Sequence, residues 1–197
     1  MSTPEALQYE QYYHIYNRGN NRETLFRQER NYHYFMELYA RHIYAVAETF
    51  AYCLLPNHFH FAVRIKSESD IAEVLLKRNP HKSLDPGQNF GNLFNAYTKT
   101  INNAYGRTGS LFEKPFHRKP VTDDNYFRRL VLYIHRNPQK HGLIDDFRLW
   151  PFSSYASLFS DQPTRLIRDE VLAAFGDIET FIQQHDEFNP GEFEEEF

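Results

Sequence analysis

Hydrophobic and polar residues alternate along several short segments of the chain, a pattern that predicts β-strands with one buried face. The alternation occurs over Tyr12–Arg18, Val46–Leu55 and His58–Lys66. The second and third segments flank a Pro-Asn turn, and they therefore predict a hairpin. A fourth strand is expected over 111–121 at the edge of the sheet, because its two prolines each remove a backbone donor.

Apolar residues recur every three or four positions in other segments, which is the spacing of amphipathic helices. Helices are expected over Arg27–Tyr44, Ser67–Lys77, Leu93–Tyr105 and Thr122–Arg136. Residues 78–92 carry two prolines and two glycines, and they predict a loop inserted into or between helices. The last helix is expected to stop at the Asn-Pro pair 137–138, since a residue before proline avoids the helical conformation.

The expected elements run in the order β-α-β-β-α-β-α. This order is typical of the split βαβ, ferredoxin-like pattern: an α+β fold with one antiparallel sheet, helices on one face and a C-terminal helical extension. Residues 1–145 are expected to form the main domain, with residues 146–185 packed on it as the extension. The acidic tail 186–197 is expected to be disordered.

The composition fits one globular domain of 197 residues, of which 41% are hydrophobic and 17% aromatic. The single cysteine, Cys53, cannot form an internal disulfide, so a reduced cytoplasmic location is expected. The chain carries neither a basic leader with an apolar stretch nor an apolar run long enough to span a bilayer. Secretion and membrane insertion are therefore not expected.

The formal net charge of -4 hides an uneven distribution. Six acidic residues lie in 186–197, and the rest of the chain carries a formal charge of +2. Residues 107–140 hold eight lysines or arginines against three acids, a local excess of +5. Such a segment can line a phosphate-binding surface or form an ordinary solvated face, and charge alone does not separate the two.

The segment Pro56-Asn57-His58-Phe59-His60-Phe61 carries the first candidate chemistry. On a strand, His58 and His60 share one face, where two imidazoles can converge on one divalent metal ion. The phenylalanines between and after them would face the core. A half-exposed strand that carries two histidines without any metal fits the same short pattern.

The second candidate lies on the last expected helix, where Tyr133 and Asn137 are four residues apart and share one side. Tyr133 flanks the apolar stripe of this helix and need not be a core residue, and a phenol in such a place can attack phosphorus once its proton is lost. The amide of Asn137 can add an oxygen ligand to the two imidazoles, a set that suits Mg²⁺ or Mn²⁺. Edge packing of Tyr133 and helix termination by Asn137 are the structural alternatives.

Together, the 56–61 segment and Tyr133-Ile134-His135-Arg136-Asn137-Pro138 resemble the motifs of single-tyrosine HUH transposases, which are named for two histidines flanking a hydrophobic residue. The chain is similar in particular to the REP-associated tyrosine transposases, within the insertion sequence 200-like group. The resemblance covers about residues 12–175 and includes the first strand, the 109–112 segment and the Trp-Pro-Phe-Ser-Ser-Tyr segment at 150–155. One departure is Asn137, where transposases of the wider group carry Gln.

This resemblance implies a ferredoxin-like catalytic domain in which Tyr133 is the nucleophile and His58, His60 and Asn137 bind Mg²⁺ or Mn²⁺. Tyr133 would attack a phosphodiester in single-stranded DNA, leaving a 5′ phosphotyrosine and a free 3′ hydroxyl, and a second 3′ hydroxyl can reverse the step. Family members recognise hairpins formed by palindromic repeats. The side chains expected to contact this DNA are Lys114, Arg118, Lys119, Arg128 and Arg129.

Two other functions fit parts of the same pattern. The first is a module that binds single-stranded or hairpin nucleic acid without cutting it, with the tyrosine as a stacking platform. The second is an unrelated zinc hydrolase that uses the His-x-His pair and needs further ligands, for which His14 and His117 are candidates. The resemblance favours a monomer, although other members of the superfamily form dimers.

Overall fold

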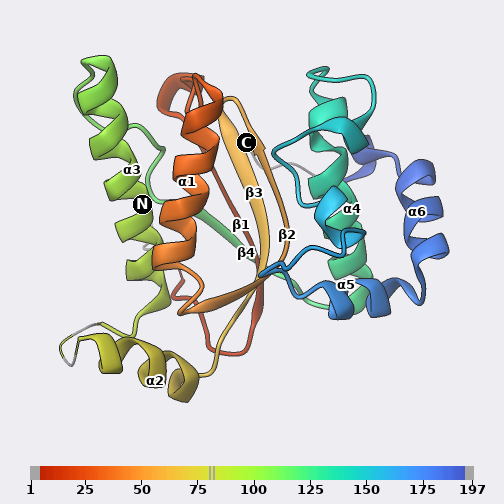
Figure 1. The fold of residues 1–197 in the computed structure, drawn as a ribbon, viewed down its shortest axis with the longest axis horizontal. Helices are drawn as coiled ribbons and strands as arrows, with labels where there is room; N and C mark the ends of the chain where they lie inside the picture. Colours follow the sequence, from red (N-terminus) through yellow and green to blue (C-terminus); the bar gives the residue numbers. More distant parts are fainter. Residues whose placement is uncertain (1–4, 80, 82, 194–197) are drawn as a thin grey trace.

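The computed structural model describes residues 5–79, 81 and 83–193. A four-stranded antiparallel sheet lies at the centre of the molecule, between two groups of helices (Figure 1). The strands are β1 Tyr12–Arg18, β2 Ala47–Leu55, β3 His58–Ile65 and β4 His117–Pro120. Their spatial order, β2-β3-β1-β4, is that of a split βαβ unit, so the predicted α+β, ferredoxin-like fold is confirmed.

Helices α1 (Glu29–His42) and α3 (Pro86–Tyr105) cover one face of the sheet (Figure 1), as expected for the two helices of this unit. The alternation predicted for β3 also holds, since Phe59 and Phe61 belong to the buried cluster formed with these helices. Tyr39 of α1 stacks on Phe61, with ring centroids 4.3 Å apart. Aromatic packing therefore fixes α1 against the centre of the sheet.

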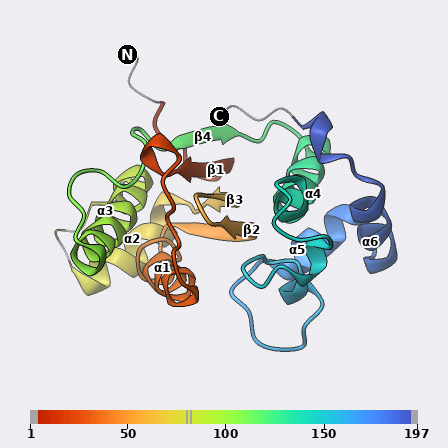
Figure 2. The ribbon, with the colours of Figure 1, turned by 90° about the horizontal axis from the view of Figure 1, so that it is seen from above.

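The opposite face is covered by α4 (Asp124–Lys140) and by the C-terminal segment, which contains α5 (Arg168–Phe175) and α6 (Ile178–Glu187) (Figure 2). A second buried cluster joins the sheet, α4 and these helices. The helices of the βαββαβ unit thus lie on one face as predicted, and α4 adds a layer on the other. Among the described helices, none combines the length and hydrophobicity that a bilayer crossing requires.

Helix α3 begins at Pro86, earlier than predicted, and α2 (Glu68–Arg78) precedes it at one end of the sheet. The carboxylate of Asp85 caps α3, because it accepts a hydrogen bond from the backbone N–H of Gly87 at 2.8 Å. Pro86 occupies the first turn, where a helix needs no N–H partner. The expected loop at 78–92 was therefore wrong over its last seven residues.

Helix α4 runs through Asn137 and Pro138 to Lys140, so the stop predicted at 137 was wrong. A proline in the last turn removes one backbone hydrogen bond, and the buried cluster around α4 compensates for that loss. The helix ends where Gly142 takes a positive φ of 64°, a conformation that glycine adopts without strain.

Two further segments differ from their predictions. The last strand is limited to 117–120, and residues 111–116 join the sheet through a bridge between Phe112 and Gly19. The expectation of a disordered tail was wrong for residues 186–193, because α6 extends to Glu187 and Phe193 is buried in the second cluster. Apolar contact outweighs the acidic composition there, and residues 194–197 lie outside the described part of the chain.

A buried chain of hydrogen bonds joins α4 to α6. His135 Nδ1 lies 2.9 Å from His185 Nε2, and His135 Nε2 lies 2.8 Å from the Ser154 hydroxyl. His185 Nδ1 donates to the carbonyl of Phe181 at 2.8 Å, so each ring has one donor and one acceptor role and both rings are neutral. Burial lowers the pKa of both histidines, that of His185 to about 3.

These two histidines predict a loss of stability on acidification. Their pKa values are lowered in the folded state and lie near 6.5 in the unfolded state, so the unfolded chain takes up protons first. The stabilisation is complete above pH of about 6.5 and falls below it by up to about 1.4 kcal/mol per pH unit for each histidine. Urea unfolding at a series of pH values measures this slope.

His185→Gln is expected to reduce the slope, because one of the two coupled rings is gone. His33→Gln is the matched control, since the side chain of His33 is 65% exposed. A slope that is the same in wild type and His185→Gln would contradict the prediction.

Candidate active site

His58 and His60 extend from β3 towards α4, as their shared strand face predicted. They are buried, with 7% and 0% of their surfaces exposed, because α4 covers the face that was expected to be open. His58 Nε2 lies 3.2 Å from Asn137 Oδ1 on α4, and His58 Nδ1 lies 2.7 Å from Asn57 Oδ1. The fold thus brings the His-x-His segment and Asn137 together across 79 positions of sequence.

The surroundings of His58 and Asn137 fit a cation ligand set. If Nδ1 of His58 donates to Asn57 Oδ1, then Nε2 carries the lone pair, and it faces the amide oxygen of Asn137. An imidazole nitrogen and an amide oxygen are both ligands that divalent cations accept, so this pair can contribute to a cation site. The Asn137 Nδ2 is buried and has no hydrogen-bond partner among the described residues, which also suits an amide that is used through its oxygen.

His60 is held by a hydrogen bond that the sequence analysis did not predict. Its Nδ1 lies 2.9 Å from Nε2 of His14, which is itself buried on β1. Burial, together with the neighbouring His14 and His58, lowers the pKa of His60 well below its usual value. His60 therefore presents a neutral imidazole, the form that binds metal ions.

Tyr133 lies one helical turn before Asn137 and faces the same histidines. Its ring meets that of His60 edge to face, with centroids 5.4 Å apart, and Lys140 Nζ lies 5.0 Å from the Tyr133 centroid. The side chain is fully buried, although its place at the flank of the apolar stripe did not require a core position. Phe193, near the C-terminus, stacks on it with centroids 4.4 Å apart and covers the ring.

The histidines proposed as extra ligands for a zinc hydrolase lie elsewhere or are engaged differently. His14 is bonded to His60, and His117 stacks on Tyr16 with ring centroids 4.9 Å apart. Within the described residues, no three His, Cys, Asp or Glu side chains form a group that could hold a metal ion. A metal centre at this site therefore depends on the amide of Asn137.

The five side chains expected to contact DNA do not form a single surface. Alternation along β4 places Arg118 and Lys119 on opposite faces of the sheet. The Arg118 guanidinium lies 4.0 Å from the ring centroid of Phe116, and Lys119 Nζ lies 5.9 Å from that of Tyr126 on α4. The others lie on the 109–116 segment and on α4, where Arg128 donates to a backbone carbonyl of α5; they are Lys114, Arg128 and Arg129.

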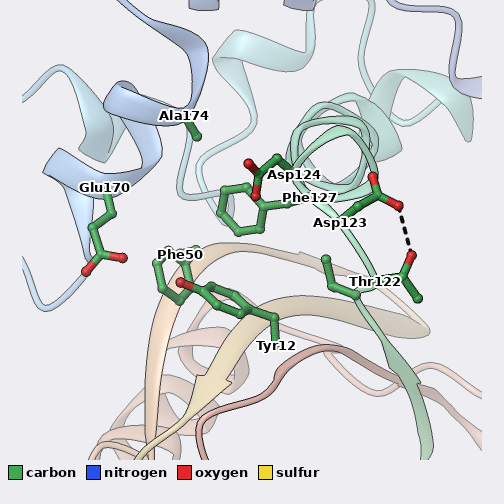
Figure 3. A pocket seen from close by; sticks show the side chains of 9 residues that line it. Tyr12, Phe50, Thr122, Asp123, Asp124, Phe127, Glu170 and Ala174 are labelled. Carbon is green, nitrogen blue, oxygen red and sulfur yellow. Dashed lines mark hydrogen bonds between the residues drawn. The ribbon is translucent and has the colours of Figure 1, made fainter.

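A separate cavity of about 250 Å³ lies beside the first turn of α4 (Figure 3). Asp123 at its edge caps α4 by accepting from the backbone N–H of Tyr126 at 2.8 Å. Glu170 on the other side is paired with Arg64 at 3.2 Å. These carboxylates have structural partners, and their charge makes the cavity unsuitable for a phosphate. The aromatic residues that line it are Tyr12, Phe50 and Phe127.

Sequence reasoning missed the importance of two residues. His14 shares its face of β1 with Tyr12 and Tyr16, so alternation together with the predicted strand order contained a signal for it. Phe193 lies within an acidic segment, and nothing in the local pattern distinguishes it from the other phenylalanines there. Its role depends on the path of the chain after α6.

The fold is shared with a known group of proteins. The solved structure of a REP-associated tyrosine transposase bound to a REP hairpin matches with a TM-score of 0.61 and 16% sequence identity, over 83% of this chain and 88% of that one. A Haemophilus influenzae protein that carries the name of REP-associated tyrosine transposase is 27% identical over 112 residues. The match covers 55% of this chain and 58% of that relative. No family model matches the chain.

Both relatives carry the family name that the motifs at 56–61 and 133–138 indicated, so the predicted resemblance is confirmed. At 16% identity the structural match establishes a common fold. The sequence match extends over little more than half of the relative. The function of this chain therefore depends on the geometry of its own site.

The stacking of Phe193 on Tyr133 predicts how the phenol can be exposed. Phe193→Ala is expected to make Tyr133 accessible to a tyrosine-nitrating reagent, because the ring that covers it is removed. Mass spectrometry of the nitrated peptides measures the change. Phe188→Ala is the control, since Phe188 is only partly buried in the same segment. Equal nitration of Tyr133 in both variants would show that Phe193 does not cover it.

Proposed function

We propose that this protein is a transposase or endonuclease that cleaves and rejoins single-stranded DNA, at palindromic hairpins, through a 5′-phosphotyrosine intermediate. The observation that carries the proposal is the convergence of Tyr133, His58, His60 and Asn137 at one place between β3 and α4. A hydroxyl nucleophile, two imidazoles and an amide oxygen are groups that can carry out metal-assisted phosphoryl transfer.

In this mechanism the Tyr133 oxygen attacks the phosphorus of a phosphodiester. The phenol loses its proton as a tyrosine–phosphorus bond forms, the bond from phosphorus to the 3′ oxygen breaks, and that oxygen takes up a proton, so the departing strand leaves with a 3′ hydroxyl. The new phosphodiester retains the energy of the old one, so another 3′ hydroxyl can displace Tyr133 and join the strands. Lys140, next to the Tyr133 ring, adds positive charge where a phosphate would enter.

His58, His60 and Asn137 would hold a divalent cation, for which we propose Mg²⁺ or Mn²⁺ because the set mixes nitrogen and oxygen ligands. When bound, the cation would act as a Lewis acid on the phosphate oxygens. Asn57 orients His58 through the 2.7 Å contact to Nδ1, and His14 orients His60. These outer contacts fix which nitrogen of each ring is presented.

The proposed partner is single-stranded or hairpin DNA, and the structural relative bound to a REP hairpin supports this choice. Because Arg118 and Lys119 lie on opposite faces of β4, the edge strand of the sheet, DNA would wrap the β4 edge. We propose that the protein acts as a monomer in the cytoplasm.

The proposed reaction predicts a covalent adduct between protein and DNA. Labelled single-stranded DNA with palindromic repeats is incubated with protein and Mn²⁺ or Mg²⁺, and a denaturing gel resolves the product. We expect a shifted band that depends on the metal and disappears in Tyr133→Phe and His58→Ala. Tyr12→Phe, which alters a tyrosine of β1 outside the site, is the control and is expected to form the adduct.

The same experiment separates the two rival functions. DNA binding that persists in Tyr133→Phe, with no adduct from the wild type, would favour a binding module without catalysis. Zinc-dependent hydrolysis without any adduct would favour the unrelated hydrolase. Neither outcome is compatible with the proposed tyrosine mechanism.

The contact between His14 and His60 predicts a role in metal binding. His14→Leu removes the acceptor for His60 Nδ1, and loss of such an outer contact typically weakens metal binding by about 10- to 100-fold. Mn²⁺ affinity, measured by electron paramagnetic resonance on free protein, tests this without DNA. His14→Gln retains an acceptor and should restore part of the affinity, whereas His117→Leu, near Tyr16, should leave it unchanged. Equal affinities for His14→Leu and wild type would refute the role.

A further inference from the structure

A cavity of about 670 Å³ lies between α3 and residues 109–116, a volume typical of small-molecule sites, which span roughly 300–1,000 Å³. Asn17 of β1 lines it, and this residue follows Tyr13 and Ile15 on the face of the sheet that α1 and α3 cover. The cavity is therefore on the face opposite to Tyr133. The proposed reaction at Tyr133 leaves it without a role.

The cavity is open because α3 presents small and polar residues on this side. Gly91, Asn95 and Thr98 follow one another at intervals of four and three residues and share one helix face. A side chain at Gly91 would meet no atom within 4 Å at its first carbon. The helix thus leaves open space beside Gly91, into which a longer side chain at this position can extend.

Aromatic rings form the apolar wall of the cavity. Phe94 of α3 lies 5.2 Å from Phe112 and 5.4 Å from Phe116, measured between ring centroids. Phe94 and Phe112 are buried, with 7% and 2% of their surfaces exposed, so the wall is held by the core. The partly buried ring of Phe116 completes the wall, and an apolar surface of this kind can contact an unstacked nucleobase.

The remaining lining residues are polar and suit the edges of a base. Asn95 carries both a donor and an acceptor, and Thr98 and Ser110 each carry a hydroxyl. Lys114, exposed at the same cavity, adds a positive charge that can neutralise a backbone phosphate. An aromatic wall, an amide, hydroxyls and a lysine together match one nucleotide better than a purely apolar ligand.

The cavity is linked to the active site through the end of β1. Glu113 lines it, and its carboxylate accepts from Arg18 Nε at 2.7 Å. Arg18 is the residue of β1 that pairs with His58 in the sheet. A DNA strand that passes the end of β1 can therefore reach both the cavity and the site at His58.

We propose that the cavity between α3 and residues 109–116 binds one unstacked base of the DNA that Tyr133 cleaves, and that it contributes to sequence selection. This inference rests on the proposed function, because it requires DNA bound at the β4 edge of the sheet. It adds a base-binding site that none of the metal-binding or nucleophilic residues contributes to.

The test fills the cavity and removes bases one at a time. Gly91→Leu occupies the gap, and Asn103→Leu, at an exposed position of the same helix, is the matched control. Binding of hairpin DNA with single-stranded flanks is measured by fluorescence anisotropy in the presence of EDTA, so no cleavage is needed. A series of hairpins carries an abasic site at each successive unpaired position.

We expect one abasic position to weaken binding to the wild type by about 5- to 150-fold, the range for one base stacked on aromatic rings. Gly91→Leu should weaken binding of the intact hairpin by a similar factor and lose the response to that position. Asn103→Leu should behave as wild type. A response that is unchanged in Gly91→Leu, or is absent from the wild type, would overturn the inference.

Failure of this inference is distinguishable from failure of the proposed function. The adduct assay reports on Tyr133, and it can succeed while Gly91→Leu retains its base response. Conversely, a base response lost in Gly91→Leu together with no adduct from any protein would support the cavity and reject the catalysis. Circular dichroism of Gly91→Leu checks that the helix content is retained.

Discussion

The packing of α4 across the histidine-bearing face of the sheet is the contact on which the site depends. If α4 did not pack there, His58 and His60 would lie on an open sheet face, without the contacts that α4 makes to them through Tyr133 and Asn137. The contact buries imidazoles, which is unfavourable unless each ring nitrogen has a partner. Asn57 meets this requirement for Nδ1 of His58, and His14 meets it for Nδ1 of His60.

Helix α4 makes buried contacts on two sides. Towards the sheet, α4 contributes the side chains that meet His58 and His60. Towards the C-terminal segment, it joins a buried cluster that includes Phe147, Phe181 and Val171. The segment after α4 therefore forms part of the support for the active site and is not a separate appendage.

Much of the fold could be predicted because half-buried strands produce a clear alternation of hydrophobic and polar residues in the sequence. Alternation located β1 without error and β2 and β3 to within one residue. The same alternation placed His58 and His60 on one face, but it could not reveal that α4 covers that face. Burial of a polar face depends on contacts between distant segments, and a local pattern does not contain them.

The errors in the helices have a related cause. Pro86 and Pro138 were interpreted as breaks. Pro86 lies in a first turn, where a missing N–H is tolerated, whereas Pro138 costs α4 one hydrogen bond that its burial offsets. The motif spacing of Tyr133 and Asn137 was informative because four residues is nearly one turn. The covering of Tyr133 by Phe193 was not predictable, since the two residues are sixty positions apart.

The hydrogen bonds of His135 determine the angular position of α4 about its own axis. Successive residues turn by about 100°, so Tyr133 and Asn137 point nearly the same way while His135 points to the far side. A rotation of the helix that moved Asn137 away from His58 would also pull His135 away from His185 and Ser154. The partners of His135 in the C-terminal segment thus fix the rotation of α4 about its axis. A chain with a different C-terminal extension would need other partners for the residue at position 135 to keep the same orientation.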